Sequence, residues 1–190
     1  MSDDLFGDDV RQRIYERCLE ERNSNLWNFK RYYFASSVYR WFDVGTNLLI
    51  AILGGVLTYN FAWEVLPVYI MILVSLVIGG LSLYKAIDKP GEKAERLHST
   101  GRRFQRLFDE LQDFIELELK DDTYDNRELK ERFSDLAEKR HILKQEAPPL
   151  SGIWYRWIKW RREDQIYEEA ATTPEEREKL EHMFNNHADQ

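Results

Sequence analysis

The sequence is poor in the residues that build disulfides and metal centres. Cys18 is the one cysteine, so no intrachain disulfide can form, and Cys-rich metal sites, which need at least two thiols, are excluded. The four histidines are scattered, and His182 and His187 are five positions apart, which does not align them as the i, i+4 ligand pair of a helical zinc site. We therefore expect no metal site, and a reducing compartment fits the cysteine content.

The sequence also lacks the motifs of common catalytic sites. Its glycine pairs, at 54–55 and 79–80, lie inside apolar runs and not in a phosphate-binding loop. Residues 121–125 imitate the start of a calcium loop, but Asn126 replaces the turn glycine and Arg132 stands where the bidentate glutamate belongs. The many carboxylates are typical of the solvated face of amphipathic helices. The sequence thus indicates a protein that is not an enzyme and uses no cofactor.

Positive charge is in deficit. The formal net charge is −7, the pI is about 5.2, and much of the negative excess lies from Glu163 onward. Nonspecific binding of nucleic acid depends on Lys and Arg that neutralise phosphates, so no nucleic-acid partner is expected. Residues 1–9 are acidic where a secretory signal is basic and then apolar, so we expect no cleaved signal.

Charge is almost absent from the middle of the chain, and this absence predicts two membrane spans. The mean hydropathy of −0.59 would suit a soluble protein, yet Glu64 is the only charged residue between Val44 and Tyr84. Segments 44–63 and 65–84 each supply about twenty residues, the length that a helix needs to cross a hydrocarbon core of about 30 Å. The alternative is a buried hairpin of a soluble protein, but the second segment has almost no polar stripe.

The charges that flank the two segments predict their orientation. The connection at 60–67 contains no Lys or Arg, and aromatic rings next to it favour the headgroup level. The basic residues lie on the other side of both spans: Lys30, Arg31, Arg40, Lys85, Lys89, Lys93 and Arg96. Positive residues stay in the cytoplasm, so we expect both termini there and the first span to direct the chain to the inner (plasma) membrane.

Small and polar residues recur at three- and four-residue steps within the spans, which places them on one face of each helix. They are Asn47, Ala51, Gly54 or Gly55, and Thr58 in the first span, and Ser75, Gly79 and Ser82 in the second. One interpretation is close helix packing, because small residues let backbones approach in lipid. The other is that Asn47 and Thr58 line a water-filled path, because polar residues inside membranes are often functional.

The remaining helices predict a cytoplasmic body. Five apolar residues after the second span are spaced like a coiled-coil seam and could join copies of the chain. They are Leu97, Phe104, Phe108, Leu111 and Ile115. The sequence at 89–91 predicts a turn or kink before this helix, which runs over 92–119, and a short polar joint predicts an antiparallel second helix over 125–144.

Interleaved aromatic and basic residues occur at two places. The N-terminal helix passes from cytoplasm to headgroups through Arg40 and Trp41. The segment after the proline break at 148–149 contains Trp154, Trp157, Lys159, Trp160 and Arg161. This segment could pack on the cytoplasmic helices, lie on an anionic membrane surface, or stack on a ligand such as a nucleotide. Residues 172–176 then predict an N-cap and the start of a last surface helix.

The expected fold is therefore all-α, a two-transmembrane hairpin with a cytoplasmic helical bundle or coiled-coil body. Its parts are an N-terminal cytoplasmic and interfacial helix at 1–42, the transmembrane hairpin at 43–84, cytoplasmic antiparallel helices at 85–147, and the aromatic-basic segment with an acidic C-terminal helix at 148–190.

This layout resembles the SLATT family of two-transmembrane effectors in prokaryotic conflict systems. The resemblance rests on NFKRYY at 28–33, the hairpin, KAERLH at 93–98 and the EAPP break at 146–149, and it covers about residues 10–160. It implies an inner-membrane effector of antiviral defence. Such an effector would assemble or open, on a signal from a nucleotide-generating or nucleotide-sensing partner, and permeabilise the membrane. It implies no catalytic residues.

Two helices cannot enclose an aqueous path, so a pore requires a homo-oligomer in the lipid bilayer. A membrane-anchored scaffold that binds a protein partner is the alternative. A small ion channel or transporter is a third possibility, although such a protein would have a charged or carbonyl-lined site at mid-membrane.

Overall fold

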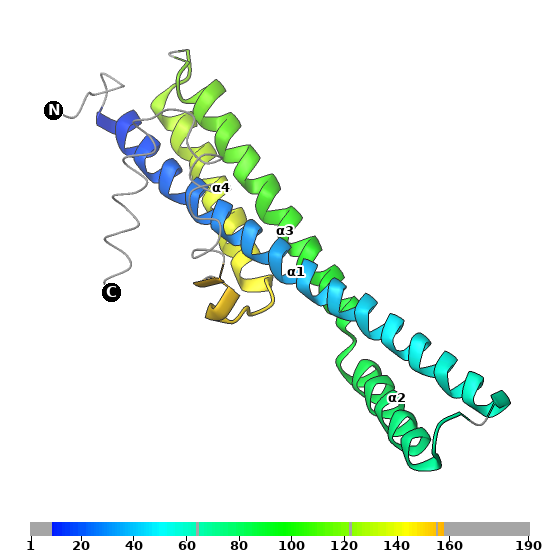
Figure 1. Cartoon of the computed structure of the whole chain (residues 1–190). Coiled ribbons are helices and arrows are strands. Elements are labelled where there is room, and N and C mark those ends of the chain that lie inside the picture. The colour runs from blue at the N-terminus through cyan, green and yellow to red at the C-terminus, as the bar shows by residue number, and fades with distance from the viewer. Residues whose placement is uncertain (1–8, 64, 122, 155, 158–190) are drawn as a thin grey trace. The chain divides into compact units, whose positions relative to one another are not determined.

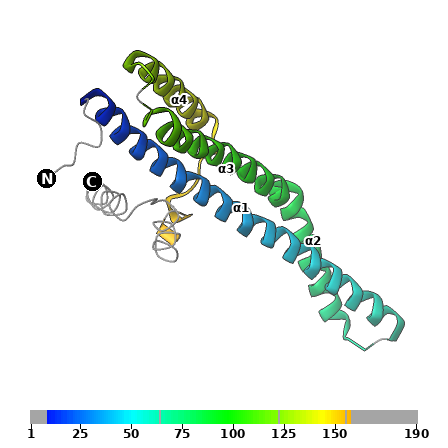
Figure 2. The ribbon, with the colours of Figure 1, turned by 90° about the horizontal axis from the view of Figure 1, so that it is seen from above.

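The structure is a computed structural model that describes residues 9–63, 65–121, 123–154, 156 and 157. Over these residues the chain is helical and has no strands (Figures 1 and 2). The elements are α1 (Asp9–Trp63), α2 (Val68–Asp88), α3 (Pro90–Asp113), a π-helical turn (Phe114–Glu118) and α4 (Asn126–Glu146). The all-helical expectation and two long apolar helices are thus confirmed.

The chain forms two compact units. One contains Met1–Phe34 with Ser99–Gln190, and the other contains Ala35–His98. Because α1 and α3 are each divided between the units, the boundaries do not coincide with the predicted ones at 42 and 84. The N-terminal helix and the first apolar segment, predicted as separate parts, form one α-helix without a break.

The break between α2 and α3 lies where the sequence predicts it. Lys89 adopts the left-handed conformation with φ of 46°, and its N–H donates to the carbonyl of Lys85 at 3.0 Å, which closes α2. Pro90 then starts α3. Proline is tolerated at this first position because a backbone N–H there would have no acceptor within the helix. The left-handed conformation costs a non-glycine residue about 1 kcal/mol or more in conformational energy. The surrounding contacts therefore hold Lys89 in this conformation, and α2 ends there.

The first unit is built from the N-terminal part of α1, from α3 and from α4, which lie side by side in both views (Figures 1 and 2). Two ring pairs join α1 to α3. Tyr32 stacks on Phe104 with centroids 5.5 Å apart, and Phe29 meets Phe108 edge to face at 5.7 Å. At Gly101 an added Cβ would lie 3.2 Å from the Tyr33 ring, so glycine allows α3 to approach α1 closely.

The predicted seam lies inside the chain. Leu97, Phe104, Leu111 and Ile115 are buried and Phe108 is half-buried. In this arrangement the seam is covered by the chain's own helices and offers no apolar stripe to a second copy. The spacing detected a packing face correctly, but its partner for Phe104 and Phe108 is α1.

Helix α4 runs antiparallel to α3, as the short joint predicts. Three ion pairs connect α3 and the π-helical turn that follows it to α4 in opposite order: Arg103 to Glu146 at 2.6 Å, Glu110 to Lys139 at 2.7 Å, and Glu118 of the turn to Arg132 at 3.5 Å. The joint itself is held by Arg11 of α1, which is 8% exposed. Its guanidinium donates to the carbonyls of Leu119 (3.3 Å), Asp121 (3.1 Å) and Tyr124 (2.6 Å).

Candidate functional site

The second unit contains the apolar parts of the two helices that are long and apolar enough to cross a membrane. Only 6% of the apolar window in α1 and none of that in α2 is buried within the chain. A core helix of a soluble protein would be mostly covered by its own chain. Here Leu48 of α1 is 60% exposed and Leu76 of α2 is 69% exposed, so large apolar side chains face the surroundings.

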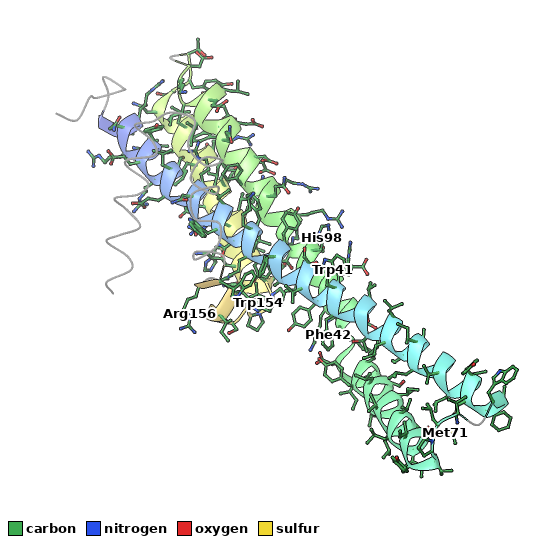
Figure 3. All side chains as sticks on the ribbon, in the orientation of Figure 1. Trp41, Phe42, Met71, His98, Trp154 and Arg156 are labelled. Atoms are coloured by element: carbon green, nitrogen blue, oxygen red, sulfur yellow. The ribbon has the colours of Figure 1, made fainter. Side chains whose placement is uncertain are left out.

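These two segments lie side by side and antiparallel. At one end Phe42 meets Tyr84 edge to face at 5.8 Å, and at the other end Asn60 contacts Met71 (Figure 3). Side chains that are less exposed recur at steps of four and three on each helix, which is coiled-coil spacing. They are Thr46, Ile50, Leu53, Leu57 and Asn60 on α1, and Ile70, Val74, Ile78, Leu81 and Lys85 on α2.

Apart from Asn47, which accepts a hydrogen bond from Lys85 of α2, the predicted small and polar face lies outside this contact. Asn47, Ala51, Gly55, Thr58, Ser75, Gly79 and Ser82 are all exposed. A Cβ added at Gly55 or Gly79 would meet nothing within 4 Å, so neither glycine is needed for the approach of α1 to α2. The large aliphatic residues pack the pair, and the small residues form a second face on the outside of it.

Two hydroxyls of this outer face bond within their own helices. Thr58 Oγ1 donates to the carbonyl of Gly54 at 2.9 Å, and Ser75 Oγ donates to that of Met71 at 2.9 Å. Such bonds to the residue four positions back satisfy the hydroxyl donor without a partner from another helix. These hydroxyls can therefore lie in lipid without an unsatisfied donor. Their oxygen lone pairs can still accept hydrogen bonds.

A charged cluster joins the two helices at the end away from the turn. Lys85 Nζ lies 2.9 Å from Asp43 Oδ1 and also donates to Asn47 Oδ1, and the side chains of Lys85 and Asp43 are 21% and 25% exposed. Gly91 fits against this cluster, since an added Cβ would lie 3.3 Å from Asp43 Oδ2. The cluster was not predicted from the sequence. The i, i+4 spacing of Asp43 and Asn47 was the available signal.

The other lysines near this end are also paired. Lys93 contacts Asp88, and Lys89 lies 2.9 Å from Glu92. Three of the seven basic residues that predict a cytoplasmic location, Lys85, Lys89 and Lys93, thus carry carboxylate partners at this end of the helix pair. Ser36 supports it by donating to the carbonyl of Ala94 at 2.7 Å.

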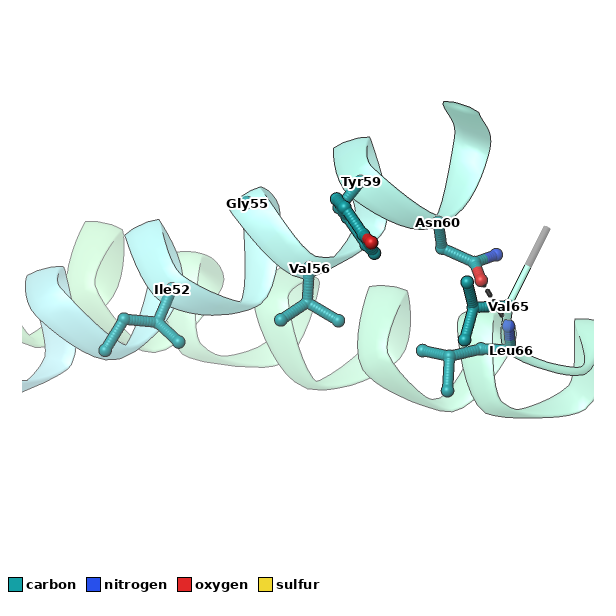
Figure 4. A pocket seen from close by; sticks show the side chains of 7 residues that line it. All are labelled: Ile52, Gly55, Val56, Tyr59, Asn60, Val65 and Leu66. Carbon is teal, nitrogen blue, oxygen red and sulfur yellow. Dashed lines mark hydrogen bonds between the residues drawn. The ribbon is translucent and has the colours of Figure 1, made fainter. Parts of the chain in front are cut away.

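A single amide organises the turn at the opposite end. Asn60 is 2% exposed; its Oδ1 accepts from the backbone N–H of Leu66, and its Nδ2 donates to Met71 Sδ. Beside it lies an apolar groove of about 420 Å³ (Figure 4). The residues that line it are Ile52, Gly55, Val56, Tyr59, Asn60, Val65 and Leu66. Gly55 belongs to both this groove and the small-residue face.

The predicted interfacial residues lie in both units. Arg40 is exposed and Trp41 is 77% exposed on α1. In the first unit Trp157 stacks on Phe34 of α1 at 4.9 Å, and Trp154 meets the same ring edge to face at 5.8 Å (Figure 3). These contacts favour the packing interpretation for the start of the aromatic-basic segment. Lys159, Trp160 and Arg161 lie outside the described residues.

The described part of the first unit contains one buried thiol. Cys18 is fully buried, and this burial raises the pKa of its thiol to about 12, against the smaller opposing effect of Arg22. At neutral pH such a thiol is not a nucleophile. Among the residues that the structure describes, no three His, Cys, Asp or Glu side chains are grouped to hold a metal ion.

Comparison with protein-family models, with curated proteins and with solved structures finds no match for this chain. The features of this chain that bear on function are therefore the geometry of the helix pair and its exposed faces.

Proposed function

We propose that this chain is an integral membrane protein that crosses the bilayer twice, through the C-terminal part of α1 and α2, with both termini in the cytoplasm. We propose further that several copies assemble and permeabilise the inner membrane as the effector of a prokaryotic conflict system. The observation that carries the proposal is the outer face of small and polar residues, which the chain's own helix pair leaves uncovered.

Exposure of the apolar side chains supports the membrane location. Side chains such as Leu48, Ile52, Leu73 and Leu76, each more than half exposed, would be unfavourable in water at roughly 25 cal/mol per Å² of apolar surface. In a bilayer the same surface meets lipid tails and costs nothing. Paired lysines at one end and Tyr59 and Trp63 at the other match the two headgroup regions in chemistry.

The small-residue face supports assembly. Lipid supplies no hydrophobic drive between helices, so transmembrane helices associate where small residues allow close contact. Gly55 and Gly79 leave open space on both helices of the pair, which suits the backbone of a neighbouring copy. The hydroxyls of Thr58 and Ser75 would then lie at or near the path between copies, with Asn47 and its Lys85 partner at the cytoplasmic end.

The resemblance to two-transmembrane conflict effectors adds the trigger to this proposal, a protein partner that makes or senses a nucleotide signal. No described residue is assigned to that signal.

The experiment combines oligomeric state with membrane permeability. We would reconstitute the full chain into lipid nanodiscs for mass photometry and into dye-loaded liposomes for release. We expect a defined oligomer and dye release for the wild type. Gly55→Leu and Gly79→Leu should both reduce the oligomer and slow release, because the larger side chains hold neighbouring helices apart.

Val77→Leu is the matched control, since it changes an exposed residue of α2 that is not one of the small residues. It should leave both signals unchanged. A wild-type chain that stays monomeric and releases no dye, with or without a nucleotide-dependent partner, would overturn the proposal.

A membrane-anchored scaffold is the second candidate, and the separate core of the first unit favours it. That unit contains its own buried residues, such as Leu19, Phe104 and Leu129. Replacing residues 44–84 by an unrelated two-span anchor separates the candidates. Retained cellular activity supports the scaffold, and lost activity at equal expression supports the pore.

A further inference from the structure

The first unit has a cationic groove on the surface between α3 and α4. Its volume is about 230 Å³. Leu107 and Leu143, each 4% exposed, form its apolar floor, and Ile142 stands at its edge with 45% of its surface exposed. An apolar groove between two packed helices is a common binding site for a third, amphipathic helix.

The charges around the groove are mostly positive. Arg103, Arg106 and Lys139 line it, and Glu110 is the one carboxylate among the lining residues. Arg103 and Lys139 are held by carboxylates of the same two helices. Arg106 makes no hydrogen bond or ion pair to any residue in the described ranges, so the groove presents an uncompensated guanidinium beside an apolar floor.

The C-terminal part of the chain has the complementary composition. Residues 163–190 contain nine acidic and two basic residues, a net charge of −7, which equals the net charge of the whole chain. Residues 1–162 are therefore neutral overall. Within this tail, Leu180, Met183 and Phe184 follow the i, i+3, i+4 spacing of one apolar helix face, between glutamates.

A helix of about a dozen residues, as predicted from Pro174 onward, is marginal in water unless its apolar face is covered. The connecting residues 158–173 can extend over roughly 50 Å, so the length of the chain does not limit which face of the unit the tail reaches.

We propose that the acidic C-terminal segment of this chain, residues 174–190, docks as an amphipathic helix in the cationic groove between α3 and α4. Leu180, Met183 and Phe184 pack on Ile142 above the floor of Leu107 and Leu143, and the glutamates of the segment neutralise Arg106. The tail is thus an intrachain ligand of the cytoplasmic helices. The groove and the tail take no part in the pore proposed above, so the two proposals fail independently.

Disulfide trapping in the full chain tests this docking. We would introduce Ile142→Cys and Met183→Cys, reconstitute the protein into nanodiscs, oxidise it mildly and follow the intrachain disulfide by gel mobility and peptide mass. Cys18 can remain, because it is fully buried. The matched control is His141→Cys with Met183→Cys, since His141 is exposed beside Ile142 but does not line the groove.

We expect the Ile142 pair to form its disulfide at least about tenfold faster than the control pair, because only the docked state holds the two thiols in contact. Equal rates for the two pairs, or no disulfide in either, would overturn the proposal. A disulfide between two chains, seen as a dimer, would also overturn it and assign the groove to a second copy.

Charge exchange tests the recognition chemistry. In the Ile142/Met183 cysteine background, Arg106→Glu should slow disulfide formation at least about threefold, and adding Glu181→Lys should restore part of the rate. Arg127→Glu, at an exposed position of α4 away from the groove, should have no effect. Slowing by Arg106→Glu that no charge exchange in the tail restores would show that Arg106 acts only on the structure of α3, against the proposal.

Discussion

The ion pair between Lys85 and Asp43 should stabilise the contact between α1 and α2 measurably. Its atoms are 2.9 Å apart, and about a quarter or less of each side chain is exposed. Exposed pairs contribute about 0–1 kcal/mol, whereas breaking a buried pair costs about 3–5 kcal/mol. A half-buried pair at the end of the helix pair should lie between, so we expect a coupling energy of about 1–2 kcal/mol.

A double-mutant cycle with Lys85→Met and Asp43→Asn measures this coupling. The double variant should lose less stability than the sum of the losses in the two single variants. Each single variant leaves one charge without its partner, whereas the double variant removes both charges. Reversible unfolding in mixed micelles, followed by helical circular dichroism, gives the four free energies of unfolding. Asn47 also accepts from Lys85, so the Lys85→Met variant removes both interactions and should be the more destabilised of the two.

Lys89 and Glu92 provide the control cycle. They lie at the same distance of 2.9 Å, but both side chains are more than half exposed. We expect no measurable coupling there, because water screens an exposed pair. A coupling below about 0.5 kcal/mol for Lys85 and Asp43, or equal coupling in the two cycles, would refute the reasoning from burial.

Three further predictions concern single residues. The pKa of about 12 for Cys18 is three units above the ordinary thiol value of 9.0, so at pH 8 its thiolate fraction falls about a thousandfold. Maleimide should therefore label it far more slowly in the native protein than in denaturant, and equal rates would contradict its burial. Gly101→Val should lower stability by about 1–3 kcal/mol in chemical unfolding, because its side chain meets the Tyr33 ring. Gly45→Ala, which meets nothing within 4 Å, should not lower it. Asn60→Leu should cost about 1–3 kcal/mol by leaving the Leu66 N–H without its acceptor. Unchanged thermal unfolding of that variant would show that the turn does not depend on the amide.

Much of the secondary structure follows from the sequence because it depends on local chemistry. The left-handed Lys89 followed by Pro90 ends one helix and starts the next, as the turn signal predicts. The polar joint before Asn126 places α4 antiparallel to α3. The first apolar segment ends at Trp63 as predicted, since the following residues interrupt the helical pattern.

Packing partners were harder to predict, because spacing shows that a face packs but not against what. Phe104 and Phe108 have the spacing of an oligomer seam, yet α1 supplies Tyr32 and Phe29 to cover them. On the helix pair the large aliphatic residues make the contact, and the small residues do not. Both faces have helical periodicity, so periodicity alone could not separate the inner face from the outer one.

The turn closed by Asn60 has a consequence for signalling. In the proposed orientation the residues that reach the outside are a few apolar and aromatic ones at headgroup depth, including Tyr59 and Trp63. In that orientation the outside would meet only this short apolar connection, so a signal that acts on the described residues would act from the cytoplasm.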